Sequence, residues 1–393
     1  MKQNWLSAAG LAACTLFISS AALAQNAGAN GARLQGYYGV RPWDGGNPPD
    51  ALRSSSVGTT IPMSNFNITA TKNGSNYSGV LVGTSPFDST LSGSNTTVLV
   101  IPLSITIGST TFNPSAPEAC DGGATPLVRF ALSPLVQNVP NLTIAGQNVG
   151  TAQYTDGFRK AEFWSLVGGN AAYSNPLSFY FGGTISLSAA AVGIHGTIFG
   201  NGCQKMGIVS NTWLDGYLRL GLMPWLQSHG YLSPSMFVIF LVHNVVQSLS
   251  NPPNILTCCI LGYHGATGNP VQTYAVINWD STNIFVGASD AAIASHEIAE
   301  WMDDPLGTNP TPAWGNVGQV LGCQSNLENG DPLSGKTVPA ITMNGFSYHP
   351  QELAFFSWFF NSVATPSLGA GGKFSSNGTF AGPAKPCPPG GTN

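Results

Sequence analysis

Short apolar runs separated by turn signals predict β-strands through the first third of the chain. Between residues 59 and 111, such runs alternate with Asn-Gly, Ser-Gly and Pro-Phe steps, and the strongest run spans 98–107. Further along, the runs at 236–243 and 273–280 predict two neighbouring buried strands. From residue 151 onward, apolar residues also recur at helical spacing, which predicts helices over 151–164, 211–223 and 289–304.

The first two of these helices carry further expectations. In the first, Asp156, Arg159 and Glu162 are spaced to pair with one another, and we expect a surface ion ladder on a packed helix. Pro224 is expected to end the second, because a proline inside a helix removes a backbone donor.

The helix over 289–304 carries the most informative pattern. It is apolar almost all the way round, which is typical of a buried helix. His296 and Glu300 are four residues apart and therefore lie on one face, with Glu297 about 100° round the helix beside them. This is the spacing of the H-E-x-x-H zinc helix with its second histidine replaced by glutamate. Because buried acids and an imidazole need a partner charge, the pattern predicts a bound divalent cation; the alternative is a surface helix with this strip in water.

A catalytic metal site needs a third protein ligand and one open position. Glu328, in the run L-E-N-G-D-P, is the first choice for that ligand. The competing residues are Asp304, Asp331 and His349. Asp303 or Asp304 is alternatively expected to hold the His296 ring by a hydrogen bond.

With one histidine and two glutamates, a Zn²⁺ site would be formally neutral. Zn²⁺ in such a site is a weaker Lewis acid than Zn²⁺ held by the usual two histidines and one glutamate. The extra carboxylate also reduces the preference for zinc over Mn²⁺ or Ca²⁺. In this scheme Glu297 takes a proton from the attacking water, and His349, Tyr348 or His264 stabilises the oxyanion. His264 lies in the run G-Y-H-G, where a purely structural role is the alternative.

The first residues have the pattern of an export signal. Lys2 precedes an apolar stretch over 6–23, and Ala22-Leu23-Ala24 forms a small-x-small cleavage site. Of the seven cysteines, Cys14 lies in this leader and six remain, which allows up to three disulfides in a secreted chain. The adjacent Cys258 and Cys259 are expected to bond outward to two different partners, because a bridge between neighbours is strained.

Composition narrows the classes of partner. Only 8% of the residues are charged, against about 25% in ordinary globular domains, and the net charge is −4. Without a basic patch, a nucleic-acid partner is not expected. No apolar stretch after the leader reaches the roughly 20 residues of a transmembrane segment. We expect a secreted monomer that acts on a peptide or protein substrate, while the many Asn, Thr and Trp residues also suit a cell-wall or carbohydrate partner.

The chain also resembles a known group of secreted proteins. The run H-E-I-A-E-W-M-D-D-P, then Trp314 and E-N-G-D, is similar to the pattern H-E-x-A-E-x-x-T-D-P … W … E-I-G-D of bacterial zincin-like HExxE metallopeptidases. Those proteins are distantly similar to the plant Exordium-like, phosphate-induced secreted proteins. The resemblance covers 151–360 and implies a zinc peptidase site made by His296, Glu297, Glu300 and Glu328, with Asp331 beside it. The chain differs from the pattern at Asp303, where threonine is expected, and at Asn329, where isoleucine is expected.

Together these patterns predict an α+β protein with a zincin-like metallopeptidase core, made of a mixed sheet and an active-site helix. The expected parts are a signal peptide over 1–24, a poorly ordered arm over 25–58, a β-rich region over 59–150 and a metal-site domain over 151–393. The function predicted first is a secreted metal-dependent hydrolase, most simply a zinc metallopeptidase. The alternative is a non-enzymatic extracellular module that binds a wall or carbohydrate component and holds a structural metal.

Overall fold

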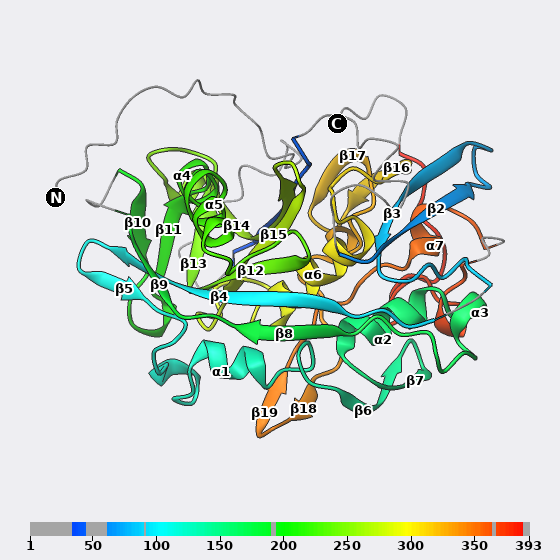
Figure 1. The fold of residues 1–393 in the computed structure, drawn as a ribbon, viewed down its shortest axis with the longest axis horizontal. Coiled ribbons are helices and arrows are strands. Elements are labelled where there is room, and N and C mark those ends of the chain that lie inside the picture. Colours follow the sequence, from blue (N-terminus) through cyan, green and yellow to red (C-terminus); the bar gives the residue numbers. More distant parts are fainter. Residues whose placement is uncertain (1–33, 45–60, 90–91, 190–193, 364–366, 388–393) are drawn as a thin grey trace.

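One large mixed β-sheet forms the centre of the molecule and takes strands from both halves of the chain (Figure 1). The computed structural model describes residues 34–44, 61–89, 92–189, 194–363 and 367–387. The main path of the 11-stranded sheet is, in spatial order, β10 (Gly196–Phe199), β11 (Met206–Ser210), β13 (Val245–Ser248), β14 (Cys258–Thr267), β15 (Gln272–Trp279), β12 (Met236–His243), β4 (Thr96–Ile107) and β5 (Thr110–Phe112). Three further strands pair beside this path: β1 (Tyr37–Arg41) with β14, and both β8 (Leu177–Phe181) and β9 (Ile185–Ser188) with β4. The fold class is α+β, as the sequence predicts.

Strand β12 lies inside the sheet, which explains why its sequence is apolar at almost every position. It runs parallel to β15 on one side and to β4 on the other. Phe237 and Ile239 belong to one apolar core, and the alternate residues Val238 and Phe240 belong to a second core on the opposite face. Both faces are therefore covered, as is usual for parallel strands. The strands predicted at 98–107, 236–243 and 273–280 are confirmed as β4, β12 and β15.

Helices cover the two faces of this sheet (Figure 1). Helix α6 (Ala291–Asp303) packs on β14 and β15, and α2 (Tyr154–Glu162) packs against α6. On the other face lie α4 (Asn211–Tyr217), the π-helical turn η3 (Leu218–Leu222) and α5 (Met223–Ser228), whose apolar residues share a core with β12. The position of α6 matters most, because this is the helix with the H-E-x-x-E spacing.

Two expectations about the helices are wrong. The helical segment continues past Pro224, which follows the π-helical turn η3, where the regular ladder of helical hydrogen bonds is already interrupted. The expected ion ladder on α2 is buried and not on the surface, because α2 packs against α6. Its Arg159 pairs with Asp303 at the end of α6 and donates to two backbone carbonyls there and on a neighbouring strand.

Outside the large sheet, the described residues form two-stranded hairpins and short helices. The hairpins are β2 (Met63–Thr69) with β3 (Asn76–Val82), β6 (Val139–Ile144) with β7 (Gln147–Ala152), β16 (Pro310–Val317) with β17 (Val320–Asn326), and β18 (Ile341–Met343) with β19 (Phe346–Tyr348). The short helices are α1 (Pro126–Ala131), α3 (Trp164–Val167) and α7 (Phe356–Phe359), with the turns η1 (Ala119–Asp121), η2 (Gly202–Gln204), η4 (Ile255–Thr257), η5 (Asp331–Leu333) and η6 (Ala370–Gly372). The chain after β17 leads through η5 directly to the functional site.

The large sheet takes strands from both sides of residue 150, the boundary expected from the sequence. Strand β4, from the β-rich region over 59–150, lies between β12 and β8, so residue 150 does not separate two sheets. Within the arm over 25–58, expected to be poorly ordered, residues 37–41 form β1, which pairs in parallel with β14. Burial of Tyr38 and Val40 against the sheet holds this part of the arm in place. The signal peptide predicted over 1–24 lies outside the described residues.

Three disulfides join the six cysteines of the described residues, as Cys120–Cys203, Cys258–Cys259 and Cys323–Cys387. The expectation that Cys258 and Cys259 bond outward is wrong, because the other four cysteines pair among themselves and leave these two neighbours to each other. Disulfides are typical of exported proteins. Within the described ranges, no helix combines the length and the hydropathy that crossing a membrane requires.

Candidate metal centre

The polar strip of α6 lies inside the protein. His296 and Glu297 are fully buried and Glu300 is 1% exposed, because α6 packs between the sheet and α2. The helix begins after Asp290, whose carboxylate accepts a hydrogen bond from the backbone N of Ala291. The prediction of a buried helix is therefore confirmed, and the alternative of a surface helix with this strip in water is excluded.

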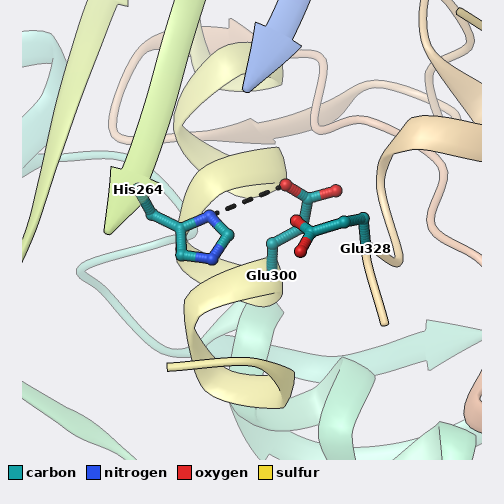
Figure 2. A group of neighbouring side chains, drawn as sticks. All are labelled: His264, Glu300 and Glu328. Carbon is teal, nitrogen blue, oxygen red and sulfur yellow. Dashed lines mark ion pairs between the residues drawn. The ribbon is translucent and has the colours of Figure 1, made fainter. Parts of the chain in front are cut away.

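Two groups of ligand-type side chains meet at Glu300. One consists of His264, Glu300 and Glu328, and the other of His296, Glu300 and Asp331. Within each group the ligand atoms lie within 4.8 Å of one another. Figure 2 shows the first group: His264 projects from β14, Glu300 from α6 and Glu328 from a separate loop, and the three side chains converge.

Glu300 lies between the two imidazoles. Its Oε2 is 3.0 Å from Nε2 of His296 and 3.8 Å from Nδ1 of His264. Its Oε1 accepts hydrogen bonds from the backbone N atoms of Gly330 and Asp331, at 3.0 and 3.2 Å. Burial alone would raise the pKa of Glu300, but the two histidines outweigh burial and the pKa is lowered. Glu300 is therefore held ionised, with one oxygen facing both imidazoles.

Each imidazole is oriented by a hydrogen bond on the side away from Glu300. Nε2 of His264 donates to the backbone O of Asp304, and Nδ1 of His296 donates to Oε1 of Gln351, both at 3.1 Å. The opposite nitrogens, Nδ1 of His264 and Nε2 of His296, have no hydrogen-bond partner among the described residues. Burial lowers the pKa of His264 to about 4, which keeps its ring neutral near pH 7. A neutral ring that donates outward and offers its other nitrogen inward has the form of a metal ligand.

Glu297 lies beside these groups, and neither of its carboxylate oxygens has a hydrogen-bond partner in the described part of the chain. Its Oε2 is 3.5 Å from Nδ1 of His264. Burial, and then the charges of Glu300 and Asp331, raise the pKa of Glu297 well above its ordinary value. Burial and Glu300 raise the pKa values of Glu328 and Asp331 in the same way. No Lys or Arg of the described residues pairs with these acids, so a bound cation is the group that would stabilise their ionised forms.

Tyr38 on β1 is a site residue that sequence reasoning missed. Its ring stacks on His296 with 3.7 Å between the ring centroids, and its buried hydroxyl has no hydrogen-bond partner among the described residues. The backbone N and O of Tyr38 both bond to the side chain of Gln319, which also donates to Asp331. The apolar run Y-Y-G-V is a signal for a short strand, but nothing in its spacing connects it with α6.

Two glycines make room for the site. A Cβ at Gly330 would lie 2.3 Å from Nδ1 of His296, and a Cβ at Gly262 would lie 2.7 Å from Oε1 of Glu297. Both separations are shorter than real Cβ atoms show. The glycine of the E-N-G-D run is therefore needed because the imidazole packs directly against the backbone.

Two residues expected to stabilise an oxyanion have other partners. Nδ1 of His349 is 2.8 Å from Oδ2 of Asp290 at the start of α6, and His349 belongs to neither ligand group. The hydroxyl of Tyr348 donates to the backbone O of Arg129. Tyr38 and His264, by contrast, lie at the centre itself.

The acids expected around His296 are also distributed differently. The carboxylate of Asp304 accepts from backbone N atoms in the loop after α6, and Asp303 pairs with Arg159. The expectation that either acid holds the His296 ring is therefore wrong, because the side chain of Gln351 occupies that position. Glu328, the first choice as third ligand, groups with His264, and Asp331 is the acid that groups with His296.

No protein-family model, no curated protein and no solved structure matches this chain. The resemblance to zincin-like metallopeptidases stays a prediction from the sequence. The geometry itself supplies two imidazoles and several carboxylates whose ligand atoms face one another, and such groups could hold a metal ion.

Proposed function

We propose that this protein is a secreted metal-dependent hydrolase, most simply a zinc peptidase, whose α6 and adjoining strands form a zincin-like core. The supporting observation is the set of buried ligand atoms that have no hydrogen-bond partner among the described residues. Nδ1 of His264, Nε2 of His296 and both oxygens of Glu297 face the same small volume. Leaving buried polar atoms unpaired costs about 1–3 kcal/mol each, and a cation at this position would remove that cost for the ligands.

The residues around the centre divide into ligands and reacting groups. A bound Zn²⁺ supplies polarisation of a scissile carbonyl and acidification of water. Glu297 is the general base, because both its oxygens are free of hydrogen bonds to the described residues. Tyr38 is the donor to the developing oxyanion, because its buried hydroxyl has no hydrogen-bond partner among the described residues and its ring stacks on His296. A site that only stabilises the fold needs ligands alone and makes no use of these two groups.

Glu297→Gln tests this assignment with little change in shape. The variant should retain the metal content and melting temperature of the wild type, while cleavage of casein or a peptide library falls by roughly 10²-fold or more. Glu118→Gln is the matched control, because Glu118 lies away from the centre and pairs with His243. Cleavage by the Glu297→Gln variant at the wild-type rate would rule out this mechanism.

A second candidate function is favoured by one specific observation, the burial of the ligand side chains. His264 and His296 are fully buried, and Glu328 is 1% exposed. Closed coordination spheres are typical of structural metal sites. In a non-enzymatic extracellular module, chelation would lower the melting temperature while no peptide or carbohydrate polymer is turned over. Metal-dependent cleavage that is lost in Glu297→Gln would exclude this candidate.

A further inference from the structure

We propose that the centre binds two divalent cations that share Glu300, one held by His264 and Glu328 and the other by His296 and Asp331. This inference rests on the proposed function in so far as it requires the cluster to bind metal. It goes further by assigning the number of ions and the ligands of each.

The separations of the ligand atoms carry the first part of the inference. Atoms bonded to one Zn²⁺ at about 2.0–2.2 Å lie roughly 3–4 Å apart. Nε2 of His296 is 3.0 Å from Oε2 of Glu300 and 3.6 Å from Oδ1 of Asp331. On the other side, Nδ1 of His264 is 3.8 Å from the same oxygen of Glu300. Each imidazole nitrogen therefore lies close enough to Oε2 of Glu300 for both atoms to bind one ion.

The two unpaired nitrogens carry the second part. Each ring is held by its own acceptor, the Asp304 carbonyl for His264 and the Gln351 side chain for His296. Neither ligand group contains both imidazoles. A single ion in either group would thus leave the other buried nitrogen without a hydrogen bond or a metal bond, whereas two ions satisfy both.

Charge gives the third part, independently of distance. The buried acids at the centre are Glu297, Glu300, Glu328 and Asp331. Ionised, they carry a formal charge of −4, and both imidazoles are neutral as ligands. One divalent ion leaves −2 on buried acids that pair with no Lys or Arg of the described residues, whereas two divalent ions neutralise this charge.

The position of Glu300 fits a shared ligand. Its Oε1 is fixed by the backbone N atoms of Gly330 and Asp331, so only Oε2 is available to both sides. Paired metal ions about 3.5–4 Å apart are a known arrangement in hydrolases, where they hold the attacking and leaving groups together. Glu297 belongs to neither ligand group and stays available as the base.

The stoichiometry of binding tests the inference on the full chain. Chelator-stripped protein is titrated with Zn²⁺ in a calorimeter, and the metal retained after desalting is measured by mass spectrometry. We expect two ions per chain in the wild type, one in Asp331→Asn and one in Glu328→Gln. The control Glu118→Gln should keep two. Because a ligand variant can fail to fold, wild-type protein loaded with Mn²⁺ is also examined by electron paramagnetic resonance, which should show an exchange-coupled Mn²⁺ pair.

The outcomes separate this inference from the proposed function. One Zn²⁺ per chain, together with the spectrum of isolated Mn²⁺, would overturn the two-ion centre and leave a single-metal hydrolase intact. No bound ion would overturn both. Two ions with a coupled spectrum, but no metal-dependent cleavage of any substrate, would support the two-ion centre and contradict the hydrolase.

Discussion

Gly330→Ala is the sharpest perturbation of the candidate centre that replaces none of its ligand residues. The added Cβ would lie 2.3 Å from Nδ1 and 2.6 Å from Cε1 and Cγ of His296. Ordinary van der Waals contact begins near 3.4 Å, so the ring has to retreat by about 1 Å. It has no room to do so, because Tyr38 stacks on it at 3.7 Å and His296 is fully buried.

The expected cost appears in two measurements. Overpacking of this kind lowers the free energy of unfolding by about 1–3 kcal/mol, measured by urea denaturation of the metal-free protein. Displacing the imidazole also breaks its hydrogen bond to Gln351, and loss of such an orienting contact lowers metal affinity by about 10–100-fold. Affinity is measured by competition with a chromophoric chelator.

The matched control for this variant is Gly183→Ala. A Cβ at Gly183 meets nothing within 4 Å, so stability and metal affinity should stay at the wild-type values. If Gly330→Ala also left both quantities unchanged, His296 would not occupy the position described, and the argument from close packing would be refuted.

Three further predictions concern the surroundings of the centre. Gln351→Leu should lower metal affinity by about 10–100-fold in the same competition assay, because the His296 ring loses its acceptor, and unchanged affinity would contradict the orienting role. Arg159→Met should lower the free energy of unfolding by about 3–5 kcal/mol, because Asp303 is left as an uncompensated buried charge; a loss below about 1 kcal/mol in urea would refute this. Burial raises the pKa of Asp280 from its usual 3.8 to about 6, so the folded protein favours the protonated carboxyl over the ionised one. This stabilisation is fully present below pH 3.8 and is lost as the pH rises through 6. Asp280→Asn should therefore gain up to about 3 kcal/mol relative to wild type between pH 4 and pH 7, and parallel stability curves would contradict the shift.

The H-E-x-x-E helix was predictable because its information is local. Apolar residues on nearly every side indicate burial, and a separation of four residues places His296 and Glu300 on one face. The orienting groups are not local. Tyr38 comes from a strand near the start of the chain, and Gln351 lies 55 residues beyond His296, so no spacing connects either with α6.

The roles of the acidic residues also depend on contacts that sequence spacing does not show. The E-N-G-D run supplies Glu328 and Asp331, yet only the fold decides which imidazole each acid faces. His264 could be read as an isolated loop histidine, because its role depends on β14 passing next to α6. Arg159 was expected at the surface, because helical spacing does not show that α2 is covered by other elements.

The two residues that depart from the expected sequence pattern contact each other in the structure. The chain has Asp303 where threonine is expected and Asn329 where isoleucine is expected. Nδ2 of Asn329 donates to Oδ2 of Asp303 at 2.7 Å, and both side chains are buried. Either polar residue alone would lose this buried hydrogen bond, whereas together they form it, and Asp303 also pairs with Arg159. The pair can be recognised only once the loop after β17 is known to lie against the end of α6.

The central claim is that the buried imidazoles and acids of α6, β14 and the E-N-G-D loop hold divalent metal. Elemental analysis of the purified full chain after gel filtration, with His296→Ala in parallel, tests it most directly. The account predicts stoichiometric zinc or manganese in the wild type and a clear loss of metal in the variant. A metal-free wild type, in which added Zn²⁺ or Mn²⁺ also fails to raise the melting temperature, would contradict it.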